Sequence, residues 1–235
     1  MNSNFKEIEN IFKGRFLTPA ANIQAKLEKI KVYIFDWDGV FNNGQKDERN
    51  TSLFNEIDAM GINMLRFNHF KRKGEMPIFG IITGERNSAS HALANREHMD
   101  FVYYKIKHKS TALEHLCKEH KVSPDEILFV FDDILDLDVA AKVGIRMMVS
   151  RPANPMLLKY AEERQLMDYL TACDSNNHAV REVIEVLIGL TGRYAETLDD
   201  RIAYNDTYRK FITLRNMLPT EYYTVEGDGI VARKP

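Results

Sequence analysis

The sequence predicts an α/β protein with a doubly wound, Rossmann-like, mostly parallel sheet and helices on both of its faces. Short apolar runs, rich in β-branched and aromatic residues, recur along the chain as buried strands do. They lie at 32–35, 78–82, 101–104, 127–131 and 145–149. Segments with helical spacing of apolar residues separate these runs. Strictly alternating strands and helices are typical of a parallel sheet.

Local signals support each predicted element. Apolar residues from Met60 to Phe67 indicate a helix that ends at the cations of 71–73, which suit a helix C-terminus. Residues 123–126 (SPDE) form a capped turn before the fourth strand, and Gly144 is expected to end a helix in a left-handed conformation. The other predicted helices cover 89–98, 112–117, 137–143, 155–166 and 179–190.

The chain has 235 residues and is 44% apolar, enough for one sizeable core, so we expect a single α/β domain at 31–190. An N-terminal helical extension at 1–30 contains a helix-start signal at Thr18-Pro19. The C-terminal part, 191–235, is expected to be one amphipathic helix and an extended, disordered tail. The alternative for this tail is that its Gly-Asp-Gly segment, 227–229, reaches a functional site.

Composition excludes several classes. A net charge of −2 without clustered Lys and Arg disfavours a nucleic-acid surface. No window has the roughly 18 apolar residues of a membrane span, and the N-terminal residues lack a signal-peptide pattern, so we expect a soluble, cytoplasmic protein with no membrane partner. Cys117 and Cys173 are not paired in a zinc or redox motif, and we expect reduced thiols.

A candidate site begins directly after the first strand, with Asp36-Trp37-Asp38-Gly39-Val40. The carboxyl ends of parallel strands are where open α/β sheets bind ligands. The strand period of two places Asp36 and Asp38 on one face and turns Trp37 into apolar packing. Two close carboxylates repel unless a cation or proton lies between them. This short motif alone is equally compatible with a solvated turn at a strand end.

Further polar residues follow the other strands at the same sheet edge. Thr83-Gly84 follows the second strand, Lys109 opens the helix after the third, and Asp132, Asp133 and Asp136 follow the fourth. This ordered set resembles the four signature motifs of haloacid dehalogenase (HAD) superfamily phosphatases. Residues 36–44 (DWDGVFNNG), 54–65, 81–86 and 179–183 are similar to the capless subfamily that includes 3-deoxy-D-manno-octulosonate 8-phosphate phosphatase. The match covers residues 30 to 188.

The resemblance implies a magnesium-dependent phosphatase, and it assigns roles to the residues at the sheet edge. Asp36 becomes the nucleophile that forms an aspartyl-phosphate, and Asp38 the general acid and base. Mg²⁺ is held by Asp36, the backbone carbonyl of Asp38 and Asp132. Other roles are phosphoryl and substrate binding by Thr83, Gly84, Arg86 and Lys109, and support of the metal ligands by Asp133 and Asp136.

The same resemblance implies a fold without a cap domain, in which a small β-hairpin flap with a turn at Asn43-Gly44 covers the site of a neighbouring subunit in a homotetramer. The alternative is a monomer that acts on a large substrate. The sequence departs from the subfamily in three places: Phe131 replaces a Gly, Thr83-Gly84-Glu85-Arg86 replaces Ser-Gly-Arg, and the flap at 45–52 is polar.

The substrate is expected to be a small sugar phosphate such as 3-deoxy-D-manno-octulosonate 8-phosphate, and other small phosphomonoesters fit nearly as well. A non-catalytic oligomerisation or sugar-phosphate-binding module of the same fold is the alternative, against which the intact Asp36 and Asp38 argue. A phosphoacceptor receiver domain is disfavoured because Tyr103-Tyr104-Lys105 stands where its phosphorylated Asp is required.

Overall fold

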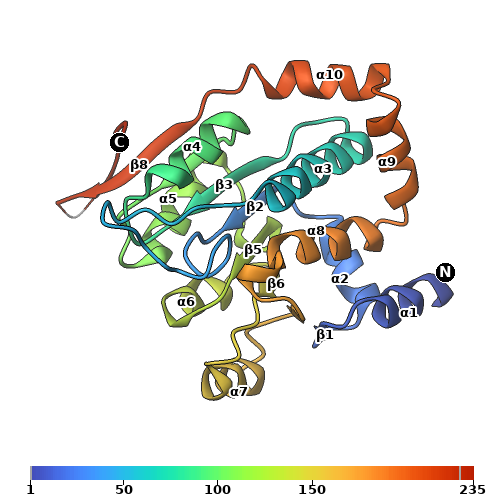
Figure 1. The fold of residues 1–235 in the computed structure, drawn as a ribbon, viewed down its shortest axis with the longest axis horizontal. Coiled ribbons are helices and arrows are strands. Elements are labelled where there is room, and N and C mark those ends of the chain that lie inside the picture. The colour runs from blue at the N-terminus through green and yellow to red at the C-terminus, as the bar shows by residue number, and fades with distance from the viewer. Residues whose placement is uncertain (1, 228) are drawn as a thin grey trace.

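The centre of the molecule is one mixed sheet. The computed structural model describes residues 2–227 and 229–235, and in these the strand order is β1-β7-β6-β5-β2-β3-β4-β8-β9 (Figure 1). The five predicted strands form its parallel middle, each hydrogen-bonded to its neighbours. They are β2 (Val32–Phe35), β3 (Ile78–Ile82), β4 (Phe101–Tyr103), β5 (Ile127–Phe131) and β6 (Ile145–Met148).

Helices cover both faces of this sheet, and the strand residues alternate between two cores. Tyr33 and Phe35 pack in one cluster, while Val32 and Ile34 pack in the other, as the period of two requires. The first cluster lies under α2 (Ala20–Leu27), α3 (Glu56–Lys73), α4 (Ser88–Arg96) and α8 (Ala179–Leu190). The second lies under α5 (Lys109–His120), α6 (Leu137–Ala140) and α7 (Pro155–Glu163).

The N-terminal extension is part of this sheet. After α1 (Asn2–Ile11), β1 (Arg15–Phe16) pairs antiparallel with β7 (Tyr169–Leu170) at one edge. The start of α2 follows Thr18-Pro19, so the predicted helix start is confirmed. Asp168, which precedes β7, accepts hydrogen bonds from Thr18 and Lys26 and so ties this extension to the sheet.

The C-terminal part differs from the expected single helix and disordered tail. It forms two helices, α9 (Tyr194–Ile202) and α10 (Asp206–Arg215), and then a hairpin, β8 (Glu221–Glu226) and β9 (Gly229–Ala232). The edge of β4 is otherwise open, and β8 pairs with it in parallel. Tyr223 stacks on Tyr103 at 4.8 Å between ring centroids, which anchors the hairpin. Asp228, in the Gly-Asp-Gly segment, lies outside the described residues.

Two local expectations are also corrected. Gly144 ends its helix without a positive φ; a Cβ there would lie 2.2 Å from the backbone oxygen of Asp125, so close packing is what requires glycine. The flap predicted around Asn43-Gly44 is a loop, and its β pairing within the described residues is one isolated bridge from Asp38 to Asn42. Side chains within the loop satisfy its backbone hydrogen-bond donors instead. The Asp47 carboxylate, for example, accepts from two backbone amides.

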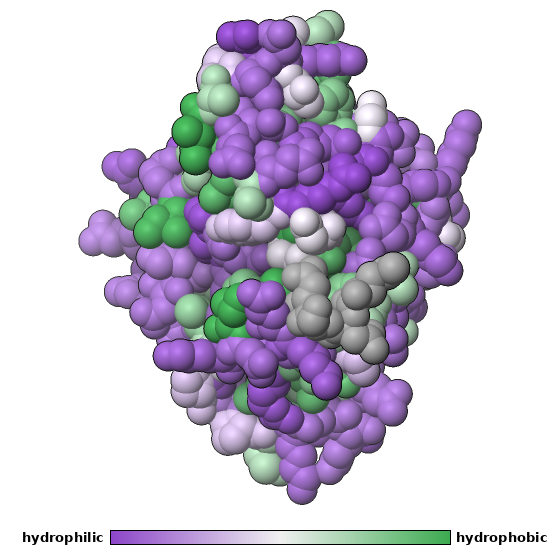
Figure 2. Space-filling model, turned by 90° about the vertical axis from the view of Figure 1, so that its right-hand side faces the viewer, coloured by the Kyte–Doolittle hydropathy of each residue, from purple (hydrophilic) through white to green (hydrophobic). Residues whose placement is uncertain are grey.

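One face of the molecule is largely polar. The face shown in Figure 2 is mostly hydrophilic, and its hydrophobic residues form small separated patches. Among the described helices, none combines the length and apolar character that a membrane span requires.

Candidate active site

Three buried carboxylates meet at the carboxyl edge of the sheet. Asp36 follows β2, Asp132 follows the adjacent β5, and Asp136 ends a 3₁₀ turn after it. One oxygen of each lies within 4.8 Å of the others. Because parallel strands end at the same edge, β2 and β5 bring their following residues together. Gly39 (φ +91°) allows this approach, since a Cβ there would lie 2.1 Å from Asp132 Oδ2.

Lys109 is the buried cation of this cluster. Its Nζ lies 2.6 Å from Asp36 Oδ1 and 2.5 Å from Asp136 Oδ1, and the side chain is 3% exposed. Burial alone would lower the pKa of Lys109, but the two carboxylates outweigh it and raise that pKa above its usual value. Lys109 is therefore held as an ammonium between the two carboxylates.

One lysine does not neutralise the cluster. Burial and then Asp136 raise the pKa of Asp36 to about 7, against the opposing effect of Lys109. Burial, Asp36 and Asp136 raise the pKa of Asp132 to about 8, although Arg151 opposes this. The carboxylates thus repel one another in a desolvated site, and a further cation would relieve that repulsion.

The cluster fits a hard divalent cation. Asp132 Oδ1 is buried and has no hydrogen-bond partner within the described part of the chain. A buried carboxylate oxygen without a partner is costly, and a metal ion supplies one. The available ligands are all oxygens, the set that Mg²⁺ prefers.

Most of the sequence-predicted site residues share one cavity of about 580 Å³. Its lining includes Asp36, Asp38, Thr83, Gly84, Lys109, Asp132, Asp133 and Asp136. Trp37 is fully buried and packs on Phe41 at 5.0 Å between ring centroids, as its predicted apolar packing requires. Phe131 is buried in the second core and stacks on Phe129, so its bulk does not displace Asp132 from the cluster.

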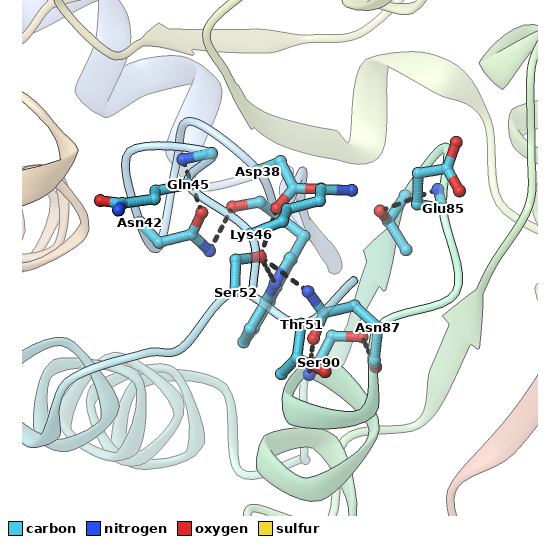
Figure 3. Close-up of polar contacts among 12 residues, drawn as sticks. Asp38, Asn42, Gln45, Lys46, Thr51, Ser52, Glu85, Asn87 and Ser90 are labelled. Atoms are coloured by element: carbon cyan, nitrogen blue, oxygen red, sulfur yellow. Dashed lines mark hydrogen bonds and ion pairs between the residues drawn. The ribbon is translucent and has the colours of Figure 1, made fainter. Parts of the chain in front are cut away.

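Arg86 lies elsewhere, which separates it from the other predicted substrate contacts. It lines a different depression with Tyr104, Lys105 and Arg233, beside the C-terminal hairpin. Glu85 lines the main cavity in its place, and Figure 3 shows it on a different loop from Asp38.

Arg151 and the pair Ser52 and Asn87 were not predicted at the site from the sequence. Arg151 follows β6, donates to Asp132 Oδ2 at 2.6 Å and to the backbone oxygen of Asn43 at 3.3 Å. Its position after a predicted strand at the same edge was a usable signal. Ser52 and Asn87 form a buried hydrogen-bonded group beside Asp38, and no motif or periodicity indicates them.

Two related proteins found by comparison carry the same name. No family model matches the chain. The 3-deoxy-D-manno-octulosonate 8-phosphate phosphatase KdsC of Escherichia coli strain B is 27% identical over 181 residues, 75% of this chain and 89% of that protein. KdsC of Yersinia pestis is 27% identical over 72% of this chain and 85% of its own length.

Solved structures agree with this. The same type of phosphatase from Moraxella catarrhalis, solved with magnesium, phosphate and KDO, superposes with a TM-score of 0.62 at 25% identity, over 75% of this chain and 96% of that one. A probable YrbI family phosphatase from Pseudomonas syringae has a TM-score of 0.64 at 22% identity, over 77% and 97% of the two chains, and supports the fold. The mostly parallel, capless α/β architecture predicted from the sequence is confirmed.

Proposed function

We propose that this chain, a homologue of the KdsC-like phosphatases of the haloacid dehalogenase superfamily, is a magnesium-dependent phosphomonoesterase that acts through an aspartyl-phosphate on Asp36. The observation that carries this proposal is the buried cluster in which Asp36 contacts Lys109 and lies beside Asp132 and Asp136. A nucleophile, a fixed cation and a set of metal ligands then line one cavity.

In the first step, an oxygen of Asp36 attacks phosphorus and the ester P–O bond breaks. Lys109 orients Asp36 and offsets negative charge on the transferring group. The Thr83 hydroxyl and the Gly84 amide donate to phosphoryl oxygens, and Asp38 gives a proton to the leaving oxygen. Mg²⁺, held by Asp36, Asp132 and the Asp38 carbonyl, supplies charge neutralisation when bound.

In the second step, water hydrolyses the aspartyl-phosphate. Asp38, now a carboxylate, takes a proton from the attacking water, and Asp36 is released. One carboxyl group therefore serves as acid and then as base. Asp133 and Asp136 support the metal ligands, since the Asp133 amide donates to Asp136 at 3.3 Å and Asp136 contacts Lys109.

The proposed substrate is a small sugar phosphate such as 3-deoxy-D-manno-octulosonate 8-phosphate. Support comes from the names of the relatives and from the KDO in the Moraxella structure. Because Arg86 lies outside the main cavity, it contacts only a part of the substrate that extends beyond this cavity. We also propose a homotetramer, in which exposed apolar residues near the cavity, such as Leu135 at 63% exposure, lie at subunit contacts.

Phosphate release from p-nitrophenyl phosphate and a panel of sugar phosphates, with and without Mg²⁺, tests the function. The wild type is expected to turn over with metal and Asp36→Asn to be inactive. Lys210→Gln, on α10, is a matched surface control that should retain full activity. If the wild-type protein is folded but turns over none of the compounds, the non-catalytic module is favoured instead.

A further inference from the structure

A buried hydroxyl lies against the carboxylate of Asp38. Ser52 is 1% exposed, and its Oγ donates to Asp38 Oδ1 (Figure 3). The same Oγ accepts from Trp37 Nε1 at 3.1 Å and from Asn87 Nδ2 at 2.6 Å. Ser52 therefore joins the loop after β2 to the start of α4. A lysine, Lys46, lies 3.1 Å from the other Asp38 oxygen, Oδ2.

The donors and acceptors fix the direction of every bond in this group. An indole Nε1 only donates. The Asn87 amide is oriented by its Oδ1, which accepts from the Ala89 and Ser90 amides as the N-cap of α4, so its Nδ2 faces Ser52 as a donor. Ser52 thus receives two hydrogen bonds, and its single proton points to Asp38 Oδ1.

This assignment distinguishes the two oxygens of Asp38. Oδ1 accepts a hydrogen bond from the Ser52 hydroxyl, so it cannot carry a proton of its own that points toward Ser52. Among the described residues, the polar partner of Oδ2 is Lys46, whose side chain is 25% exposed and can move into solvent. When Asp38 is protonated, its proton therefore lies on Oδ2.

We propose that Ser52, held by Trp37 and Asn87, is a positioning residue that makes Asp38 Oδ2 the proton-transfer atom; this rests on the proposed function. As the ester P–O bond breaks, its electron pair stays on the leaving oxygen, which takes the Oδ2 proton and leaves Asp38 a carboxylate. In the second step, the attacking water gives a proton back to Oδ2. Lys46 binds Oδ2 between these events.

The network also links this carboxyl group to the phosphate-binding loop. Asn87 is fully buried and lies four residues after Thr83, between the loop that offers phosphoryl donors and α4. A shift of this loop would move Ser52 and, through it, Asp38. The acid and the phosphoryl donors thus keep a fixed relative position.

The test compares two leaving groups. p-Nitrophenolate leaves without a proton, whereas a sugar alkoxide requires one, and a general acid contributes on the order of 10²–10⁴-fold. We expect Ser52→Ala to lower kcat/KM on the sugar phosphate about 10²-fold and kcat/KM on p-nitrophenyl phosphate less than about threefold, because kcat/KM reports the step in which the leaving group departs and not the hydrolysis that both substrates share. Ser52→Thr, which keeps the hydroxyl, should restore the ratio of the two rates.

Two controls separate this role from general stability. Ser90→Ala removes a buried hydroxyl that donates to the Asn87 backbone oxygen at 2.8 Å, and Thr51→Val removes a contact with Ser88 at 3.1 Å. Neither should change the ratio. If Ser52→Ala does not fold, Ser52→Cys gives the same readout, because a thiol is a weak donor. An equal loss on both substrates would overturn the inference, whereas an inactive wild type would overturn the proposed function itself.

Discussion

Substitution of Asp168 by Asn should weaken the attachment of the N-terminal extension to the sheet. Asp168 has a fully buried side chain that accepts from Thr18 Oγ1 at 2.6 Å, from Lys26 Nζ at 2.8 Å and from three nitrogens of Arg146 at 2.9–3.0 Å. Thr18 and Lys26 belong to the extension, and Arg146 belongs to β6. The carboxylate therefore joins both parts.

The expected loss follows from these contacts. An Asn keeps one acceptor oxygen and turns an amide nitrogen toward at least two of the donors, so two or more charge-assisted hydrogen bonds are lost. Each contributes about 1.5–3 kcal/mol. Lys26 and Arg146 are 37% and 19% exposed and can be partly rehydrated, which reduces the loss. We expect the free energy of unfolding to fall by about 3 kcal/mol.

The loss should also depend on pH. Burial raises the pKa of Asp168, but hydrogen bonds from Arg146, Lys26 and Thr18 outweigh it and hold that pKa below its ordinary value. A depressed carboxyl pKa stabilises the fold above the unfolded-state pKa, and that stabilisation disappears as pH falls through the folded-state value. The difference between wild type and Asp168→Asn should be full at pH 7 and shrink below about pH 4.

Urea unfolding followed by circular dichroism measures this directly. With a slope of about 2–3 kcal/mol/M for a chain of this size, the midpoint should fall by about 1 M. Glu162→Gln is the control, because its ion pair with Arg15 lies at the surface and contributes little. A midpoint for Asp168→Asn within about 0.2 M of wild type at pH 7 would refute the reasoning.

Three other substitutions test the packing of the fold and the charges of the site. Gly144→Ala forces a Cβ to 2.2 Å from a backbone oxygen and should lower the free energy of unfolding by about 2–4 kcal/mol, measured in urea. Gly229→Ala is the control, because its Cβ meets no atom within 4 Å, and it should change the free energy of unfolding by less than about 1 kcal/mol. Equal effects of the two substitutions would contradict this. Lys109→Met should lower kcat on p-nitrophenyl phosphate by at least about 10²-fold, and a loss under tenfold would contradict its role. Arg151→Ala removes a cation that lies 2.6 Å from Asp132 and competes there with Mg²⁺. The substitution should tighten Mg²⁺ binding about threefold to tenfold, measured by titration calorimetry. Weaker Mg²⁺ binding would argue against this competition.

The sequence was informative where one strong periodicity acts. The five central strands are short apolar runs, and parallel pairing places whatever follows them at one edge. For this reason Asp36, Thr83, Lys109 and Asp132 were expected together, and they line one cavity. Their roles remain predictions, to be decided by turnover of the variants.

What the sequence did not reveal depends on long-range contacts. The hairpin of β8 and β9 is stabilised by the open edge of β4 and by Tyr223 on Tyr103, neither of which is visible in a polar, tyrosine-rich segment. The group around Ser52 joins residues separated by 14 and 35 positions, without periodicity. Individual polar residues of this kind are recognised only when their partners are seen.

The central claim is that Asp36 becomes phosphorylated, and trapping the intermediate tests it most directly. The enzyme is mixed with Mg²⁺ and a substrate that it turns over, quenched in acid during turnover and treated with borohydride, which reduces an aspartyl-phosphate to homoserine. Peptide mass spectrometry should find homoserine at position 36 only when both substrate and metal are present. Turnover without modification at position 36, or full turnover by Asp36→Asn, would contradict the proposed mechanism.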